Sequence, residues 1–257
     1  MTPAQAIAAK ELRSAFSSPI VYVVAAVLFL IFGVLSWALV VNAGVVAIQR
    51  LQTQGLGASI NLNDLVFRPI FYWMAFYVLP LAMPMLTMRV FAEERKLRTF
   101  ELLMTSPVRI NEIVAGKFAA VLAIYLTMLG LTGIVPLTLS AYNSFDWAPI
   151  GTGYLGLALL GALFLATGLF ASSLTENQIV AAFVSFGIIF LIWLLGLTAS
   201  LTGDTTAGNV IAYISYSEHY DRLIRGVIDT RDLVYYVCAI GFMLFLTHRI
   251  VESQRWK

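Results

Sequence analysis

The sequence predicts an all-α integral membrane protein with six transmembrane helices. Hydrophobic residues make up 60% of the 257 residues and charged residues only 12%, and the mean hydropathy is +0.86. A soluble domain has about 45–50% apolar and about 25% charged residues. Six apolar stretches come close to the roughly 20 residues that a helix needs to cross a bilayer. We therefore expect residues 1–257 to form a single transmembrane domain.

The chain begins with a short segment before the first apolar stretch. In residues 1–18, Lys10 and Arg13 lie opposite one apolar side of a helical wheel, which holds Ala4, Ala8, Leu12, Ala15 and Phe16. A helix of this kind lies in the membrane interface with its charged face in water. We predict an interfacial helix; the alternative is an unstructured basic tail.

The six predicted spans follow in order. They cover residues 20–41, 70–88, 118–140, 151–173, 179–200 and 233–250. The first is longer than the ~7–15 residues of a signal-peptide core, so we expect it to be retained. Pro80 and Pro84 lie on one face of the second span and predict a bend. The fourth span is rich in small residues that allow close helix approach, within the subunit or between two subunits. They are Gly151, Gly153, Gly156, Gly161, Ala162, Ala166, Gly168 and Ser172.

The basic residues predict the orientation. With both termini and the second and fourth loops on one side, that side carries eleven of the 16 Lys and Arg residues. Such an excess is typical of a cytoplasmic face. We expect a multi-pass protein of the bacterial cytoplasmic (inner) membrane with both termini in the cytoplasm.

The spans lack Lys, Arg, Asp and Glu except at their ends. Intramembrane ionisable residues mark proton relays and ion pathways, so an ion-coupled transporter is disfavoured. Cys238 is alone, and the two histidines, His219 and His248, are predicted on opposite faces of the membrane. We therefore expect no catalytic residue, no metal site, no cofactor of its own and no nucleic-acid partner.

The loop between the second and third spans is the best-organised segment outside the membrane. Val90, Leu97, Phe100 and Met104 form one stripe at helical spacing, and Glu94, Arg98 and Glu101 form an opposite charged row. This predicts an amphipathic helix over residues 89–104, ended by Thr105-Ser106-Pro107 because the residue before proline disfavours helix. The alternative is a solvated turn.

These residues resemble a known family. The elements Glu93-Glu94-Arg95, Thr99-Phe100-Glu101, Ser106-Pro107-Val108 and Gly116-Lys117 resemble the signature of ABC type-2 exporter permeases. Near the C-terminus, Ser217-Glu218-His219-Tyr220 and the stretch 225–236 resemble, more narrowly, the gliding-motility-type permease branch.

The resemblance implies a membrane subunit that pairs with a second permease copy and with two separate ATPase subunits. The sequence has no Gly-x-x-x-x-Gly-Lys-[Ser/Thr] phosphate loop, so ATP would be bound by the partner. The ATPase-coupling residues would be Glu93, Glu94, Arg95, Arg98, Thr99, Glu101 and Pro107. We expect Glu94→Lys to weaken ATPase docking while leaving the fold intact, because exposed ion pairs contribute little.

The resemblance also implies short helices that re-enter the outer membrane face within residues 201–232. Tyr213, Tyr216 and Tyr220 are spaced by three and four residues, which predicts one aromatic stripe. Gly226 would allow a tight reversal into the sixth span because glycine tolerates positive φ. These four residues are the candidate outer gate. The alternative is a plain periplasmic loop.

Three functions remain open from the sequence. The first is the permease of an ATP-driven exporter. The second is the membrane anchor of an ATPase-driven mechanotransmission, motility or assembly complex that works on a periplasmic accessory protein without transporting a solute. The third, a membrane enzyme acting on lipid-linked substrates, is the least favoured because no nucleophile or metal cluster is present.

Overall fold

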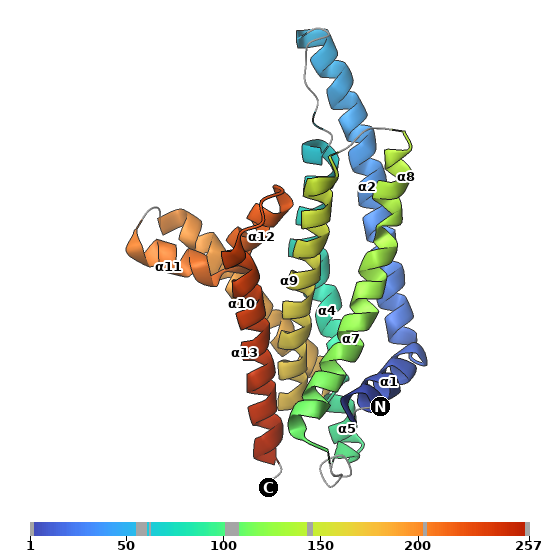
Figure 1. The fold of residues 1–257 in the computed structure, drawn as a ribbon, viewed down its shortest axis with the longest axis vertical. Helices are drawn as coiled ribbons and strands as arrows, with labels where there is room; N and C mark the ends of the chain where they lie inside the picture. Colours follow the sequence, from blue (N-terminus) through green and yellow to red (C-terminus); the bar gives the residue numbers. More distant parts are fainter. Residues whose placement is uncertain are drawn as a thin grey trace.

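The chain folds into an elongated helical bundle. The computed structural model describes residues 3–54, 61, 63–100, 108–142, 146–202 and 205–254. Within them six helical segments are long and apolar enough to cross a membrane, and none of these residues forms a β-strand. The predicted fold class is confirmed. In Figure 1 the N-terminal helix and the end of the last helix lie at the same end of the bundle, which we call the terminal end.

Each predicted span corresponds to a helix or a run of helices. The N-terminal segment is α1 (Pro3–Phe16), and the first span is α2 (Pro19–Gln54). The second span comprises η2 (Asn63–Phe67), α3 (Arg68–Trp73), η3 (Met74–Val78) and α4 (Leu79–Thr87), followed by the short α5 (Ala92–Lys96). The third span is α7 (Ile110–Thr132) with α8 (Ile134–Ser140). The others are α9 (Trp147–Leu174), α10 (Gln178–Thr202) and α13 (Thr230–Gln254), with α11 (Thr206–Ile214) and α12 (Tyr216–Ile224) between the last two.

Helix α2 is much longer than the predicted first span. Its 36 residues correspond to about 54 Å at 1.5 Å per residue, against about 30 Å of bilayer core. The predicted span ended at Val41, but the helix continues through Asn42 and Gly44 to Gln54. The far end of α2 projects beyond the neighbouring helices at the end of the bundle opposite the terminal end (Figure 1).

Prolines shape the second span. The π-helical segments η2 and η3 end just before Pro69 and Pro80, and the Leu79 amide donates to the Met74 carbonyl, five residues back. A proline ring clashes with the carbonyl four residues earlier, and a wider π turn relieves that clash. The helical pitch therefore changes before Pro69 and Pro80, whereas Pro84 lies within the regular α4; the bend expected from Pro80 and Pro84 stays a prediction.

Helix α9 is the centre of the bundle. Of the residues in its most apolar stretch, 78% are buried, against 17% for α10. Its glycines lie against large side chains from different helices: Gly153 against Phe71, Gly156 against Tyr220 and Gly161 against Tyr125. The Tyr125 hydroxyl also donates to the Leu157 carbonyl at 2.6 Å. The small residues thus serve packing within the subunit.

Gly168 provides a test of this packing. A Cβ atom at this position would lie 2.8 Å from the Cβ of Thr87, which is completely buried on α4. We expect Gly168→Ala to lower the free energy of unfolding by about 1–3 kcal/mol, the usual cost of overpacking. Gly187→Ala on α10 is the control, because nothing lies within 4 Å of the added Cβ. Thermal unfolding in detergent measures both, and equal midpoints would contradict the expected close contact.

Candidate functional site

The connection between the second and third spans forms a compact structure at the terminal end, which we call the α5 segment (residues 88–100). Helix α5 has Glu93 and Glu94 in its first turn and Arg95 and Lys96 in its last, an order that complements the helix dipole. It ends at Leu97, and Arg98 has a positive φ of 57°. The Thr99 amide and hydroxyl both donate to the Glu94 carbonyl, which caps the helix.

Helix α9 holds the α5 segment in place through Ser172. The amides of Phe91 and Ala92 donate to the Ser172 hydroxyl oxygen at 3.0 and 3.1 Å, and that hydroxyl donates to the Met88 carbonyl. The Arg95 guanidinium donates to the Ser173 carbonyl at 2.6 Å. Because these groups are largely buried, their loss would leave unpaired polar atoms. The α5 segment is therefore fixed to the central helix.

Lys117 on α7 joins three elements at the same place. Its side chain is only 1% exposed, and its ammonium lies 2.7 Å from a Glu11 carboxylate oxygen on α1 and 2.9 Å from one of Glu94 on α5. It also donates to the Val90 carbonyl at 2.9 Å and lies 5.1 Å from the centre of the Phe91 ring. A buried ammonium needs such partners to offset its lost hydration. We call Lys117, Glu11 and Glu94 the Lys117 cluster.

Close contact between α1 and α7 makes this cluster possible. A Cβ atom on Gly116 would lie 2.7 Å from the Ala4 carbonyl oxygen and 3.1 Å from Ile7. Only glycine allows α1 to approach so closely, and the approach places Glu11 over Lys117. The helix predicted within residues 1–18 is therefore present as α1 (Pro3–Phe16), but its acidic residue, Glu11, faces the bundle.

The structure corrects the predicted helix over residues 89–104. The segment turns at residues 88–91 and breaks at Leu97–Arg98, so the predicted stripe is not one helical face. Val90 and Phe100 are buried, but Leu97 is 64% exposed. A periodicity argument assumes one uninterrupted helix, and the left-handed Arg98 ends it. Met104 and the predicted coupling residues Glu101 and Pro107 lie outside the described residues.

The remaining predicted coupling residues divide into internal and outward-facing ones. Three of them make contacts inside the protein: Glu93 pairs with Arg89 at 3.0 Å, Arg95 donates to the Ser173 carbonyl, and Glu94 pairs with Lys117. Glu94 is 16% exposed and pairs with Lys117 and Lys10, not with Arg98. The Glu94→Lys prediction assumed that Glu94 is exposed and belongs to a charged row with Arg98, and this assumption is wrong. The substitution would place a cation against the buried Lys117 and destabilise the fold. The exposed part of the segment is residues 96–99.

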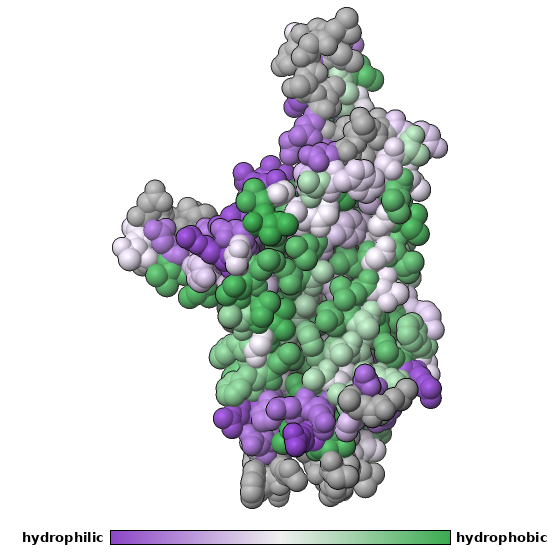
Figure 2. All heavy atoms as spheres, viewed as in Figure 1, coloured by the Kyte–Doolittle hydropathy of each residue, from purple (hydrophilic) through white to green (hydrophobic). Residues whose placement is uncertain are grey.

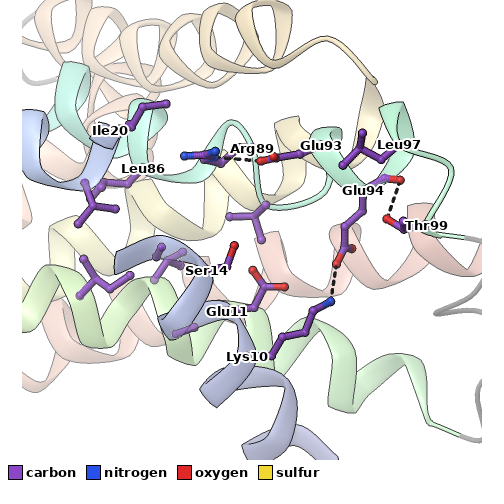
Figure 3. A pocket seen from close by; sticks show the side chains of 16 residues that line it. Lys10, Glu11, Ser14, Ile20, Leu86, Arg89, Glu93, Glu94, Leu97 and Thr99 are labelled. Atoms are coloured by element: carbon purple, nitrogen blue, oxygen red, sulfur yellow. Dashed lines mark hydrogen bonds and ion pairs between the residues drawn. The ribbon is translucent and has the colours of Figure 1, made fainter. Parts of the chain in front are cut away.

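A cavity of about 210 Å³ lies between α1, the α5 segment and α7. Figure 3 shows Glu11 and Ser14 of α1 between Arg89 on one side and Lys10 on the other. Glu93, Glu94 and Thr99 also line the cavity, and the remaining lining residues are apolar, including Ile20, Leu86 and Ile124. The cavity therefore combines a charged part with an apolar part.

At the other end of the bundle, the predicted aromatic stripe is split between two helices. Tyr213 lies on α11 and is 54% exposed, whereas Tyr216 and Tyr220 on α12 are buried. Ser215 separates the helices because its hydroxyl accepts the Ser217 amide as the N-cap of α12. The pattern Ser215-x-x-Glu218, a capping-box signature, could have predicted this break. The expected positive φ at Gly226 is confirmed at 88°.

A buried ionic cluster joins α12 to the start of α13, and the sequence did not predict it. Asp232 is fully buried; its carboxylate accepts from Arg222 Nε at 3.0 and 3.1 Å and lies 2.7 Å from His219 Nδ1. His219 Nε2 lies 3.0 Å from the Tyr213 carbonyl, and Tyr235 stacks on the imidazole at 4.0 Å. The hydrogen bond to Asp232 raises the pKa of Arg222. We call Asp232, Arg222 and His219 the Asp232 cluster.

Comparison with known proteins agrees with this architecture. Among curated proteins, none matches the sequence significantly. A family model described as ABC-2 family transporter protein matches residues 5–250. This range includes most of α1, the α5 segment, the first five spans, most of α13 and the Asp232 cluster. The chain is a multi-pass membrane protein that belongs to the ABC-2 family of transporter proteins.

Proposed function

We propose that this chain is the transmembrane permease subunit of an ATP-binding-cassette exporter, driven by separately encoded ATPase subunits that dock on the α5 segment. The Lys117 cluster carries the proposal. It connects α1, α5 and α7 through ion pairs of 2.7 and 2.9 Å around one buried ammonium. A force on α5 would therefore pass directly to two other helices.

The orientation follows from the distribution of charge. The terminal end carries α1, the α5 segment, the start of α7 and the end of α13, and with them nine of the 14 Lys and Arg residues that the structure describes. By the positive-inside rule this end lies in the cytoplasm, where an ATPase has access to ATP. The membrane is the bacterial inner membrane. Figure 2 shows hydrophilic residues at this end below an apolar band.

The docking surface is the exposed tip at residues 96–99. Leu97 is 64% exposed and is flanked by Lys96 and Arg98, which are also exposed. An apolar side chain within a charged rim has the composition of an interface anchor. We propose that Leu97 enters a groove on the ATPase, while Glu93, Glu94 and Arg95 hold the segment rigid behind it.

Leu97→Asp tests this docking surface. We expect binding of the cognate ATPase to weaken at least about tenfold, which corresponds to about 1.4 kcal/mol, and stimulated ATP hydrolysis to be lost. The fold should survive because substitutions at exposed positions change stability by about 0.5 kcal/mol or less. Tyr142→Asp, 85% exposed at the opposite end, is the matched control. Unchanged ATPase binding by Leu97→Asp, or ATP hydrolysis by the permease alone, would contradict the proposal.

Two permease copies would pair in the membrane with two ATPase subunits. Helices α2 and α10 expose large apolar side chains, including Leu30 and Trp37 on α2 and Phe183 and Leu191 on α10. A single subunit without ionisable residues lining its spans cannot easily enclose a hydrophilic path. In this arrangement α11 and α12 lie at the outer membrane interface, and Tyr213, Tyr216, Tyr220 and Gly226 form part of the outer gate.

The projecting end of α2 favours a second candidate function, a membrane anchor that transmits ATPase-driven motion to a periplasmic partner. Val45 and Ile48 are 49% and 59% exposed on this projection. Val45→Asp with Ile48→Asp separates the two functions. Loss of activity in cells with intact ATPase coupling and no detectable solute flux in vesicles would favour transmission, whereas ATP-dependent flux by the variant would favour transport.

A further inference from the structure

We propose that the cavity between α1, the α5 segment and α7 binds the headgroup of a zwitterionic phospholipid. The cavity, about 210 Å³, is far larger than the ~10–15 Å³ that one water molecule requires. Its lining residues belong to α1, the α5 segment and the adjoining parts of α2, α4 and α7, at the terminal end of the bundle (Figure 1). A ligand that fits both parts must itself be amphipathic.

Residues of α2, α4 and α7 form the apolar part of the cavity. Ile20 and Val21 belong to the first turn of α2, Leu86 to the last turn of α4, and Ala120 and Ile124 to α7. None of these side chains can hydrogen-bond, so this part favours hydrocarbon. Beyond it α2 exposes Val23, Val27 and Leu30, an apolar surface along which acyl chains could lie.

The charged part is balanced in sign. Lys10, Arg89 and the adjoining Lys117 carry three positive charges, and Glu11, Glu93 and Glu94 carry three negative ones. Because the net charge is zero, a ligand that carries both signs is favoured over an anion. Figure 3 shows Glu11 and Ser14 between the two cations that line the cavity.

Two of these side chains, Lys10 and Arg89, can make further contacts with the oxygens of a phosphate group. Lys10 is 69% exposed and lies 3.7 Å from Glu94, longer than a strong ionic hydrogen bond of about 2.7–2.9 Å. Arg89 donates its Nε to Glu93 and one terminal nitrogen to the Ser18 hydroxyl. Its guanidinium has five donors, so it can also contact a phosphate oxygen. Glu93, 40% exposed, would then accept from the ammonium of phosphatidylethanolamine.

Native mass spectrometry of the delipidated full chain tests the proposal, with phosphatidylethanolamine as the probe. We expect Arg89→Gln and Ala120→Leu each to weaken binding about tenfold, the first by removing a phosphate donor and the second by filling the apolar part. Arg249→Gln is the matched control. Arg249 is a cation at the same end of the bundle that pairs with Glu252 and does not line the cavity. Thermal unfolding in lipid-free detergent verifies that each variant is folded.

Three results would overturn the proposal: unchanged binding in both folded variants, equal binding of phosphatidylglycerol, or competition by inorganic phosphate or glycerophosphoethanolamine as strong as that by the whole lipid. The last result would identify an anion or headgroup site without a contribution from the acyl chains. The inference does not depend on ATPase docking. A failure here leaves the proposed function intact, and a failure of the Leu97→Asp test leaves the lipid site intact.

Discussion

Replacing Lys117 with Met is expected to lower the free energy of unfolding by about 3 kcal/mol. Removing one partner of a buried ion pair typically costs about 3–5 kcal/mol because the other charge stays buried without compensation. Glu11 and Glu94 are 18% and 16% exposed, which places the cost near the lower limit. Methionine has nearly the length of lysine, so the effect reports the charge and not a cavity. Thermal unfolding in detergent measures the loss.

A rescue variant and a matched control distinguish this ionic effect from a packing effect. Combining Lys117→Met with Glu11→Gln and Glu94→Gln should recover most of the lost stability because no unpaired buried charge remains in the cluster; Lys10, which loses its partner Glu94, is 69% exposed. Lys10→Met is the same substitution at the other cation that contacts Glu94, but Lys10 is 69% exposed. It should cost less than about 1 kcal/mol, as exposed pairs do. If Lys117→Met and Lys10→Met had equal midpoints, the Lys117 cluster would not stabilise the fold.

Replacing Asp232 with Asn is expected to cost about 2–3 kcal/mol and to loosen α12. Asp232 is completely buried, and its carboxylate contacts both Arg222 and the buried His219. An amide keeps the shape but loses the charge, and its N–H donors cannot pair with Arg222, which is itself a donor. Hydrogen bonds to charged groups contribute about 1.5–3 kcal/mol each. Hydrogen exchange of the α12 amides should accelerate at least tenfold relative to those of α9.

Asp221→Asn is the control for this effect. Asp221 lies on α12 and pairs with Arg225 at 2.6 Å and Arg68 at 3.5 Å, but its side chain is 41% exposed. We expect a loss below about 1 kcal/mol and unchanged exchange in α12. Equal effects of the two substitutions would show that burial of Asp232 makes no special contribution to holding α12 in place.

The two clusters have one feature in common: each fixes a short helix against a membrane span at one end of the bundle. The Lys117 cluster holds α5 and α1 on α7, and the Asp232 cluster holds α12 on α13. In the proposed exporter these short helices are the input from the ATPase and part of the outer gate. Substitutions that loosen either one should therefore uncouple ATP hydrolysis from transport before they unfold the spans.

The sequence by itself determined the number and order of the spans. Hydropathy is a property of each stretch of chain, and the cost of an unpaired backbone group in lipid forces such stretches to be helical. The positive φ of Gly226 was also predictable from the local sequence, because a tight reversal of the chain favours a glycine that can adopt it. The motif around Glu93 and Gly116-Lys117 also indicated the family, which the match over residues 5–250 confirmed.

The tertiary structure alone decided which charged side chains are buried. Lys117 looked like an ordinary juxtamembrane cation, but its partner Glu11 is 106 residues away and reaches it only because Gly116 lets α1 approach α7. Leu97 was predicted on the same helical face as Val90 and Phe100, yet a left-handed Arg98 turns it outward. Burial depends on which helices meet, and that depends on contacts far apart in the chain, whereas periodicity describes only the residues of one uninterrupted helix.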